Sequence, residues 1–535
     1  MIMNFRYLFL SLLFVSVSAF AQPSERVYVS SDRDWYAAGE TVFLSAFCMD
    51  MDADAAVFSP VSAVAYVELA SKSGRVAGTK VSLIEGRGAG MLILPRSLPT
   101  GNYSLRAYTS LGKEKVPESK VISIFNTLST ARVADGVVYG ELPESLSVPS
   151  TAKLSVERTG ERVLLTAPED CNVSVSVFRK EPFPSYNNLG IKGVLRSPAG
   201  PGAKREVPEY DGEILTLRFT DAEGAPLDAE GASVFVAHPG NVEDIYASSL
   251  GRDGLARFYT DNLFGHGDLV VALDASALPF NVEVVDPFVG VVPDSIPPLL
   301  LNPSFAESLS ALNVRMQLTS AFDADTLYTH LPTRSLAFLP DECVRYNLDD
   351  YTRFATFQEV FVEFLSDIRI RGREENLQLQ VRCRERTKGT LSFRDEPSLI
   401  LLDGVPVLQH RLITQLDPTL VRRVDVYPRI CALGGSVYSG IANFITFKGD
   451  MGGLRFGDNV KILEYDGPAF PVSFGPTHDD RYPDVRETLL WHPLVELKAG
   501  EPYSLPLFDT DEDLVLVVEG LSRSGAPIYF KLESL

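Results

Sequence analysis

Apolar and polar residues alternate with a period of two in short runs along the first part of the chain. Between residues 22 and 126 these runs cover residues 26–29, 41–48, 62–69, 79–83, 90–94, 103–109 and 120–124. Turn-forming pairs such as Ser73-Gly74 separate them. Because successive side chains of a strand point to opposite faces, the pattern predicts an antiparallel β-sandwich for residues 22–126.

Two more sandwiches are predicted further along, within residues 127–208 and 209–300. Their alternating runs lie at residues 152–157, 162–166, 172–179, 214–220 and 233–237. The Pro- and Gly-rich stretch 181–202 is typical of a loop. The Pro-rich stretch 287–303 predicts an extended connector, because Pro cannot donate to a strand ladder. Three sandwiches in tandem imply a rod.

The period changes to that of a helix beyond a linker predicted for residues 301–340. Apolar residues recur at helical spacing at Phe357, Val360, Phe361, Phe364 and Leu365. Thr356 directly precedes this run and Glu359 lies within its first turn, with the spacing of a capping box, in which each side chain satisfies the other's backbone N–H. The pattern therefore predicts an amphipathic helix that packs one apolar stripe against a sheet.

Strands and tight turns follow this helix. Strand-like runs lie at residues 377–381, 399–402, 424–427 and 441–447. Asp403-Gly404 predicts a tight turn, and Asp417-Pro418 predicts the start of a short helix. We therefore expect an α+β domain at residues 341–450. Residues 451–535 predict a last sandwich-like unit, so the fold class is mainly β, with tandem β-sandwiches plus one α+β domain.

Part of the α+β domain resembles a known family. Within residues 399–449 the phrases LLDGVPV, LDPTLVRRVDVYP and YSGIANFITFKG are similar to the plug domain of TonB-dependent outer-membrane receptors. Tyr427-Pro428-Arg429 and Ala442-Asn443-Phe444 depart from the family pattern. Only 86 residues follow Gly449 (535 minus 449), whereas a receptor barrel needs roughly 200 residues at about 9 to 11 per strand. The resemblance therefore implies a plug-like domain without a barrel.

The first predicted sandwich resembles a second family. The phrases VYVSSDRDWYAAGETVFLSAF and LPTGNYSLRAYT are similar to the MG2 macroglobulin-like domain of bacterial α2-macroglobulins. This resemblance implies an immunoglobulin-like fold in which residues 35–40 form a hairpin between two core strands, with Trp35 in the packing. Residues 209–300 and the C-terminal segment are similar to macroglobulin-like or carboxypeptidase-regulatory-like sandwiches. No Cys begins the family's thioester sequence, so a covalent protease trap is not implied.

The N-terminus indicates export, and the charge balance limits the classes of partner that are expected. Arg6 precedes an apolar stretch at residues 8–17, and Ala19-Phe20-Ala21 forms a small-x-small site, so residues 1–21 predict a signal peptide and a periplasmic or outer-membrane-associated protein. The sequence after residue 21 contains no run of about 18 apolar residues, so no spanning helix is predicted. The net charge of −21 disfavours nucleic acid as a partner.

Candidate chemistry in the sequence is sparse. The six histidines show no His-Glu-x-x-His pattern, and Asp509 to Asp513 begins like a calcium loop but lacks its Gly and its final Glu. No G-x-S-x-G motif is present. We therefore expect no enzyme activity, no cofactor and no metal. The five cysteines, far apart in sequence, leave open either buried free thiols or one disulfide.

These observations leave recognition by surfaces as the expected function. We expect a non-enzymatic cell-envelope protein, a β rod whose plug-like module docks onto a protein partner such as an outer-membrane β-barrel. The expected docking segment is a loop at residues 429–440, and the candidate partner-binding residues are Arg429, Gly434, Gly435, Tyr438 and Gly440. Packing of this loop within the domain is the alternative for these residues. The alternative function is that of an accessory component of a TonB-dependent transport system.

Overall fold

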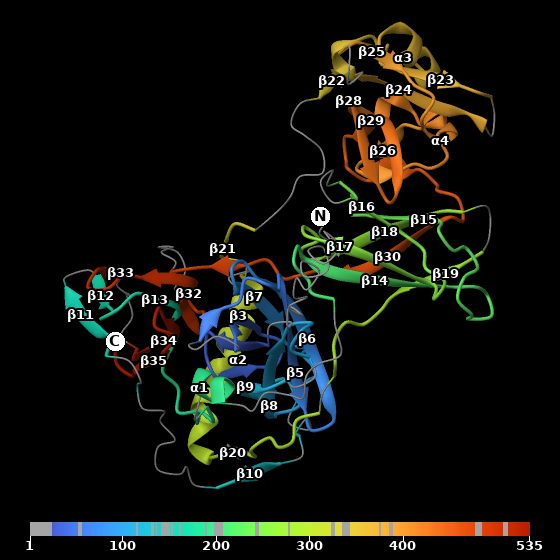
Figure 1. Cartoon of the computed structure of the whole chain (residues 1–535). Coiled ribbons are helices and arrows are strands. Elements are labelled where there is room, and N and C mark those ends of the chain that lie inside the picture. Colours follow the sequence, from blue (N-terminus) through green and yellow to red (C-terminus); the bar gives the residue numbers. More distant parts are fainter. Residues whose placement is uncertain are drawn as a thin grey trace, which may run out of the picture.

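The computed structural model shows a mainly β protein with few helices (Figure 1). It describes residues 24–51, 56–113, 116–129, 133–134, 136–140, 150, 153–159, 162–187, 190–196, 207–240, 245–275, 279–290, 292–322, 327–333, 343–373, 376–384, 389–476, 484–506 and 512–535. The predicted signal peptide lies outside these residues.

The first sandwich is built from residues 24–129, close to the predicted range. One sheet contains β1 (Glu25–Ser31), β3 (Thr41–Asp50), β4 (Val57–Phe58) and β7 (Arg87–Ile93). The other contains β2 (Trp35–Ala37), β9 (Glu118–Phe125), β8 (Gly101–Tyr108), β5 (Val64–Ser71) and β6 (Gly74–Ser82). As expected, residues 35–40 lie in the connection between two core strands that pair antiparallel, β1 and β3. Within this connection β2 also pairs in parallel with β9 of the opposite sheet. The chain therefore changes sheets at this point.

A second sandwich is assembled from two distant parts of the chain, and we call it the composite sandwich. One sheet is β11 (Ser155–Thr159), β12 (Arg162–Thr166) and β33 (Pro502–Pro506); the other is β32 (Thr488–Leu497), β13 (Cys171–Arg179), β34 (Leu514–Ser522) and β35 (Pro527–Leu532). Their side chains share one core. The C-terminal strands thus complete this sandwich, whereas the sequence predicted a separate unit. The reason is that β13 is buried along nearly its whole length and needs a strand on each side.

The third sandwich also receives a late strand. Its sheets are β17 (Leu255–Thr260), β14 (Glu213–Thr220) and β19 (Asn281–Val284), and β16 (Ile245–Ser249), β15 (Ser233–Ala237), β18 (His266–Asp274) and β30 (Val460–Asp466). Because β30 follows the α+β domain in sequence, that domain is an insertion into the third sandwich. We call residues 343–453 the inserted domain.

The inserted domain has the predicted α+β character. Its main sheet is β22 (Val344–Asn347), β28 (Val421–Leu433), β29 (Ser436–Thr446), β26 (Leu399–Leu402) and β27 (Val405–Pro406). A smaller sheet contains β23 (Ile368–Arg371), β24 (Gln378–Arg384) and β25 (Leu391–Phe393). The helices are α3 (Phe357–Glu363) and α4 (Arg411–Gln415), with single turns η3 (Leu348–Asp350), η5 (Pro418–Leu420) and η6 (Met451–Gly453).

Local signals read from the sequence are present in the inserted domain. The capping box of Thr356 and Glu359 starts α3. Asp417 accepts a hydrogen bond from the backbone N–H of Thr419 and caps η5. Asp403 and Gly404 form the expected turn with positive φ at both residues. The Asp403 carboxylate accepts hydrogen bonds from the N–H of Thr446 at 2.7 Å and of Met451 at 2.8 Å, which holds this unusual conformation.

The segment between the third sandwich and the inserted domain is more regular than the predicted linker 301–340. β20 (Leu299–Leu301) pairs with β10 (Val137–Tyr139), and η1 (Pro303–Phe305) leads into α2 (Ala306–Ala321). α2 buries Leu312 against an aromatic cluster that includes Trp35 of the first sandwich. β21 (Thr329–His330) then pairs with β31 (Val472–Ser473). A short helix, α1 (Ile191–Arg196), packs on the first sandwich within the predicted loop 181–202.

The composite sandwich and the third sandwich both pack against the first one, whereas the sequence implied a tandem rod (Figure 1). Tyr28 and Phe47 of the first sandwich pack against Leu521 of the composite sandwich. On the other side, Lys80 of the first sandwich forms a buried ion pair with Glu213 of the third at 2.7 Å. The inserted domain lies beyond the third sandwich, away from the composite one.

The five cysteines are free, which settles the alternative left open by the sequence in favour of thiols. Cys48, Cys171 and Cys383 are buried, and Cys343 and Cys431 are partly buried. Among the described residues, no helix has the length and apolar character needed to cross a membrane.

Candidate functional site

The residues predicted to bind a partner lie in a β-hairpin and not in an open loop. Arg429 is exposed on β28, Gly434 and Gly435 form the turn, and Tyr438 and Gly440 lie on β29. The turn rests on the third sandwich.

Close packing within the chain explains most of these residues. A Cβ added to Gly434 would lie 2.7 Å from the Cβ of Ala247 in β16, and one added to Gly440 would lie 2.7 Å from the Cβ of Val381 in β24. Tyr438 packs in a cluster with Ile245 of β16. The glycines therefore permit close approach inside the molecule, which is the packing alternative of the sequence analysis.

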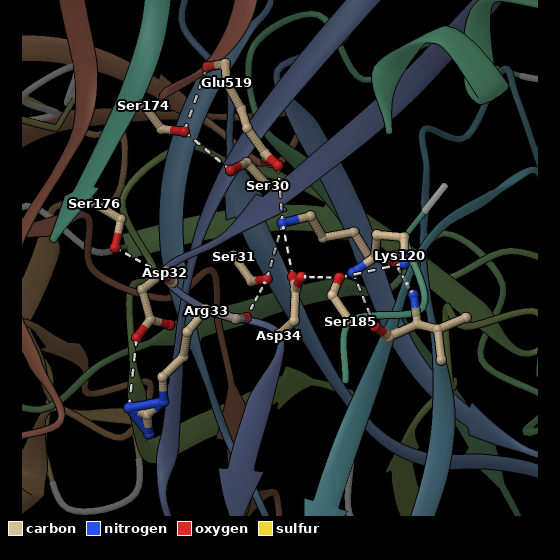
Figure 2. Close-up of polar contacts among 12 residues, drawn as sticks. Ser30, Ser31, Asp32, Arg33, Asp34, Lys120, Ser174, Ser176, Ser185 and Glu519 are labelled. Carbon is tan, nitrogen blue, oxygen red and sulfur yellow. Dashed lines mark hydrogen bonds and ion pairs between the residues drawn. The ribbon is translucent and has the colours of Figure 1, made fainter. Parts of the chain in front are cut away.

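A different part of the molecule concentrates buried charge. Asp32, Arg33 and Asp34 stand in succession between β1 and β2, where the first sandwich meets the composite sandwich (Figure 2). Asp32 is 1% exposed and Arg33 is 5% exposed. Since charged side chains are rarely buried without a partner, this contact region, which we call the seam, requires compensating groups.

Lys120 supplies one of these groups. Its Nζ lies 3.1 Å from Oε1 of Glu519 in the composite sandwich and 3.3 Å from Oδ1 of Asp34 (Figure 2). Glu519 also accepts a hydrogen bond from the hydroxyl of Tyr28 at 3.1 Å. Burial disfavours the charge of Lys120, but the carboxylates of Glu519 and Asp34 outweigh burial and raise its pKa to about 12. Lys120 is therefore a fixed cation and not an amine nucleophile at neutral pH.

Arg33 and Asp32 form the other half of the seam. Nη2 of Arg33 lies 2.9 Å from Oε2 of Glu40, and its guanidinium carbon lies 4.4 Å from the ring centre of Tyr36. Oδ1 of Asp32 accepts hydrogen bonds from the Tyr36 hydroxyl at 2.7 Å and from the N–H of Phe43 at 3.0 Å. The Ser176 hydroxyl donates to the carbonyl of Asp32 at 2.6 Å and ties the seam to β13 (Figure 2).

Two cavities flank the seam. One, of about 190 Å³, is lined by the Lys120 network and by Trp35, Phe183 and Tyr529. The other, of about 90 Å³, lies under α2, and we call it the α2 cavity. Its lining residues are Arg33, Gly39, Glu40, Thr41, Phe43, Arg96, Met316, Thr319, Ser320, Leu327, Tyr328, Phe474, Arg486, Glu487 and Thr488. Four separate segments of the chain thus meet around it.

Glu487 is the most unusual group of the α2 cavity. Its Oε1 accepts a hydrogen bond from Nε of Arg315 on α2 at 2.8 Å, whereas its Oε2 is buried and has no hydrogen-bond partner. Burial raises its pKa to about 7, and the neighbouring carboxylates of Glu40 and Glu181 add to this effect against the attraction of Arg33 and Arg315. The folded protein therefore holds a proton on this carboxyl group more tightly than an exposed glutamate does.

Sequence reasoning missed the seam and the α2 cavity. Asp32, Arg33 and Asp34 look like an exposed turn, and Glu487 precedes an ordinary strand. Their partners Lys120, Arg315 and Glu519 are far away in sequence, so no spacing signal connects them. Charge and hydrogen bonds in this arrangement join segments of the chain that are far apart in sequence. Among the described residues, no three His, Cys, Asp or Glu side chains gather as metal ligands do.

Comparisons with known proteins add little to this picture. No family model matches the chain, and no curated protein does. Among solved structures, trypsin-activated α2-macroglobulin from Escherichia coli is 11% identical with a TM-score of 0.16, and the match covers 96% of this chain and 23% of that protein. The adhesin InvE from Yersinia pseudotuberculosis is 12% identical with a TM-score of 0.13, covering 49% of this chain and 58% of that protein. Such low scores carry no argument about fold or function.

Proposed function

We propose that this protein is a non-enzymatic, exported component of the cell envelope that uses its inserted domain to dock onto a protein partner. The single observation that carries the proposal is the position of that domain. It projects from the clustered sandwiches and contacts them through one face of its main sheet (Figure 1). The resemblance of residues 399–449 to receptor plug domains supports a partner in or near the outer membrane.

The docking face that we propose is the α3 side of the inserted domain, in place of the hairpin residues expected from the sequence. The turn of the β28–β29 hairpin and the sheet face with Leu401 and Ile441 pack against the third sandwich, whereas Arg429 and Val437 of the hairpin are exposed. The opposite face carries α3, on which Val362 is 81% exposed. Tyr351, 41% exposed, stacks on Phe364 beside this helix at 4.1 Å between ring centres. These exposed apolar side chains support the α3 side as the docking surface in our proposal.

Crosslinking in intact cells tests the proposal. The native chain, tagged at its C-terminus, should yield a crosslinked partner in the membrane fraction. A variant in which residues 343–453 are replaced by a short Gly-Ser linker should lose it, because β30 and the third sandwich remain but the inserted domain is gone.

Point variants separate docking from general damage. Val362→Asp on α3 should abolish the crosslink and leave the melting temperature within a few degrees, since an exposed substitution has little effect on stability. The control Ile93→Asp places the same charge at a position of the first sandwich that is 69% exposed and should keep the crosslink. Recovery of the same partner with the domain-deleted chain would refute the proposal.

A further inference from the structure

One oxygen of Glu487 in the α2 cavity lacks a hydrogen-bond donor. Glu487 is 4% exposed and lines the cavity. Its Oε1 accepts a hydrogen bond from Nε of Arg315 at 2.8 Å, and Arg315 is not part of the cavity lining. Its Oε2 is buried and has no hydrogen-bond partner within the described part of the chain. Because a buried acceptor without a donor is unfavourable, the structure favours a ligand that donates a hydrogen bond here.

The charges that line the α2 cavity are already paired, and this pairing favours a neutral ligand. Three guanidinium groups belong to the lining. Nη2 of Arg33 lies 2.9 Å from Oε2 of Glu40, and Nη2 of Arg486 lies 2.6 Å from Oδ2 of Asp484. The third guanidinium group belongs to Arg96, an exposed residue, so water and salt screen its charge. A charged ligand would compete with one of the ion pairs, whereas a neutral ligand leaves both intact.

Hydroxyl groups in the lining indicate which neutral donor fits. Thr41 at the start of β3 and Thr319 on α2 line the cavity from two different elements. A threonine hydroxyl can donate one hydrogen bond and accept others, and a ligand hydroxyl has the same two capacities. One ligand hydroxyl can therefore donate to Oε2 of Glu487 while a second exchanges hydrogen bonds with a threonine. Two hydroxyls on adjacent carbons, a vicinal diol, meet both requirements.

Apolar side chains form another wall of the cavity. The rings of Phe43 and Phe474 meet edge to face with 4.8 Å between their centres. Met316 of α2 and Tyr328 also line the cavity. Ligand sites commonly combine such an apolar wall with a few polar groups that fix the orientation of the ligand. The wall therefore suits the C–H groups of the carbons that carry the hydroxyls.

The size of the cavity limits the part of a ligand that enters it. A volume of about 90 Å³ equals the space of roughly three water molecules at about 30 Å³ each, which suits a diol unit. Ser320 and Leu327 of the lining are exposed, so the cavity reaches the surface and the rest of a larger ligand can lie outside. We propose that the α2 cavity binds a vicinal diol, from a free polyol or from the terminal sugar of a glycan, with one hydroxyl donating to Oε2 of Glu487.

This inference is independent of the docking proposal, because the inserted domain contributes no residue to the lining of the α2 cavity. Titration of the full chain with 1,2-propanediol, followed by ligand-observed NMR, is the direct test. Trp491 packs in one cluster with Phe43 and Phe474, so tryptophan fluorescence gives a second readout. The matched ligand is 1-propanol, which has the same carbon chain and one hydroxyl fewer. We expect 1,2-propanediol to bind at least about tenfold more tightly, because 1-propanol leaves a polar group of the site unpaired.

Two charged ligands of the same chain length test whether the site prefers a neutral ligand. We expect n-propylammonium and propionate each to bind at least about tenfold more weakly than 1,2-propanediol, because either charge competes with an ion pair of the lining. Tighter binding of either charged ligand than of 1,2-propanediol would overturn the proposal.

Two variants probe different walls of the cavity. Glu487→Met removes the acceptor at similar side-chain length and should weaken 1,2-propanediol at least about tenfold. Its control is Glu501→Met, at an exposed position just before β33. Thr319→Phe fills the cavity from α2 and should abolish binding, whereas Gln317→Phe on the exposed side of α2 should not. The Thr319 variant keeps the test decisive if Glu487→Met fails to fold.

Further titrations identify the source of the diol. Binding of methyl α-D-glucopyranoside or methyl α-D-mannopyranoside that is lost in the Thr319 variant would assign a sugar. Binding of glycerol and 1,2-propanediol without either glycoside would assign a free polyol. Absence of 1,2-propanediol binding, equal affinity for 1-propanol, or binding unchanged by both cavity variants would overturn the proposal.

Discussion

At the residue scale, the seam depends on charges that compensate one another away from water. Side chains of Lys120 and Glu519 are each 3% exposed, and Asp34 is the more open partner at 23%. An ion pair desolvated in this way adds little net stability, yet removal of one partner leaves the other charge buried and alone. The seam therefore fixes how the first sandwich and the composite sandwich fit together.

Lys120→Met should consequently destabilise the protein by about 3 to 5 kcal/mol, because Glu519 and Asp34 lose their cation. Unfolding in urea, followed by tryptophan fluorescence, measures the change. Lys531→Met is the matched control: Lys531 lines the same cavity but pairs with Glu533 at a more exposed position, so its loss should cost less than about 1 kcal/mol. Equal effects of the two substitutions would contradict the role assigned to Lys120.

Glu209, where the first and third sandwiches meet, gives the stability a pH dependence. Burial raises its pKa to about 7 from an ordinary 4.5. The folded state thus holds the proton more tightly than the unfolded state, and this stabilisation is complete below pH 4.5 and lost as the pH rises through 7. We expect Glu209→Gln to remove up to about 3 kcal/mol of the decline between these pH values. Urea unfolding at both pH values checks it, and parallel curves for native and variant protein would argue against it.

At the element scale, the β28–β29 hairpin is a part of the inserted domain that contacts β16 of the third sandwich. Its strands alternate in the usual way, but the turn residues were open to two interpretations in the sequence. The close approach of Gly434 to Ala247 supports the packing interpretation. Two separate causes can require glycine in a turn: a positive φ, or a neighbour that leaves no room for a Cβ. Only the folded structure shows which of them applies at a given glycine.

Alanine at each turn glycine separates these causes. Gly434 and Gly435 both have positive φ, so either change should cost about 1 to 2 kcal/mol from the backbone. Only at Gly434 does the new Cβ meet Ala247, whereas at Gly435 the nearest atom is the Ser249 hydroxyl at 3.9 Å. Gly434→Ala should therefore also increase hydrogen exchange in β16, and Gly435→Ala should not. Exchange in β16 that is the same in both variants would show that the hairpin does not press on the third sandwich.

Sequence patterns predicted elements well where the cause was local. The strand 399–402 was placed at its observed bounds, and the capping box of Thr356 was present. Patterns failed where the cause was distant. The sequence of β13 has the pattern of an ordinary strand. Its neighbours β32 and β34 come more than 300 residues later, and no local pattern identifies them as its partners. A separation of 172 residues likewise hid the contact of Glu487 with its partner Arg315.

At the scale of the whole molecule, the interleaved chain makes the sandwiches depend on segments far apart in sequence. β13 is the central strand between β32 and β34, with Val173, Val175 and Val177 in the core. A chain that ends at residue 476 would leave both edges of β13 and this apolar face open, and exposed strand edges pair with other chains. We expect such a truncated chain to aggregate, although it keeps the complete first sandwich, third sandwich and inserted domain.

Complementation in trans distinguishes loss of these strands from general instability. Coexpression of residues 484–535 as a separate chain should restore soluble protein, because the missing strands contribute pairing and core without needing a covalent link. The control fragment carries Val518→Asp, which places a charge in the composite core and should not rescue. Solubility is measured by size-exclusion chromatography. A soluble, monomeric truncated chain with native circular dichroism would contradict the argument, since it would mean that β13 folds without the neighbours that complete its sheet.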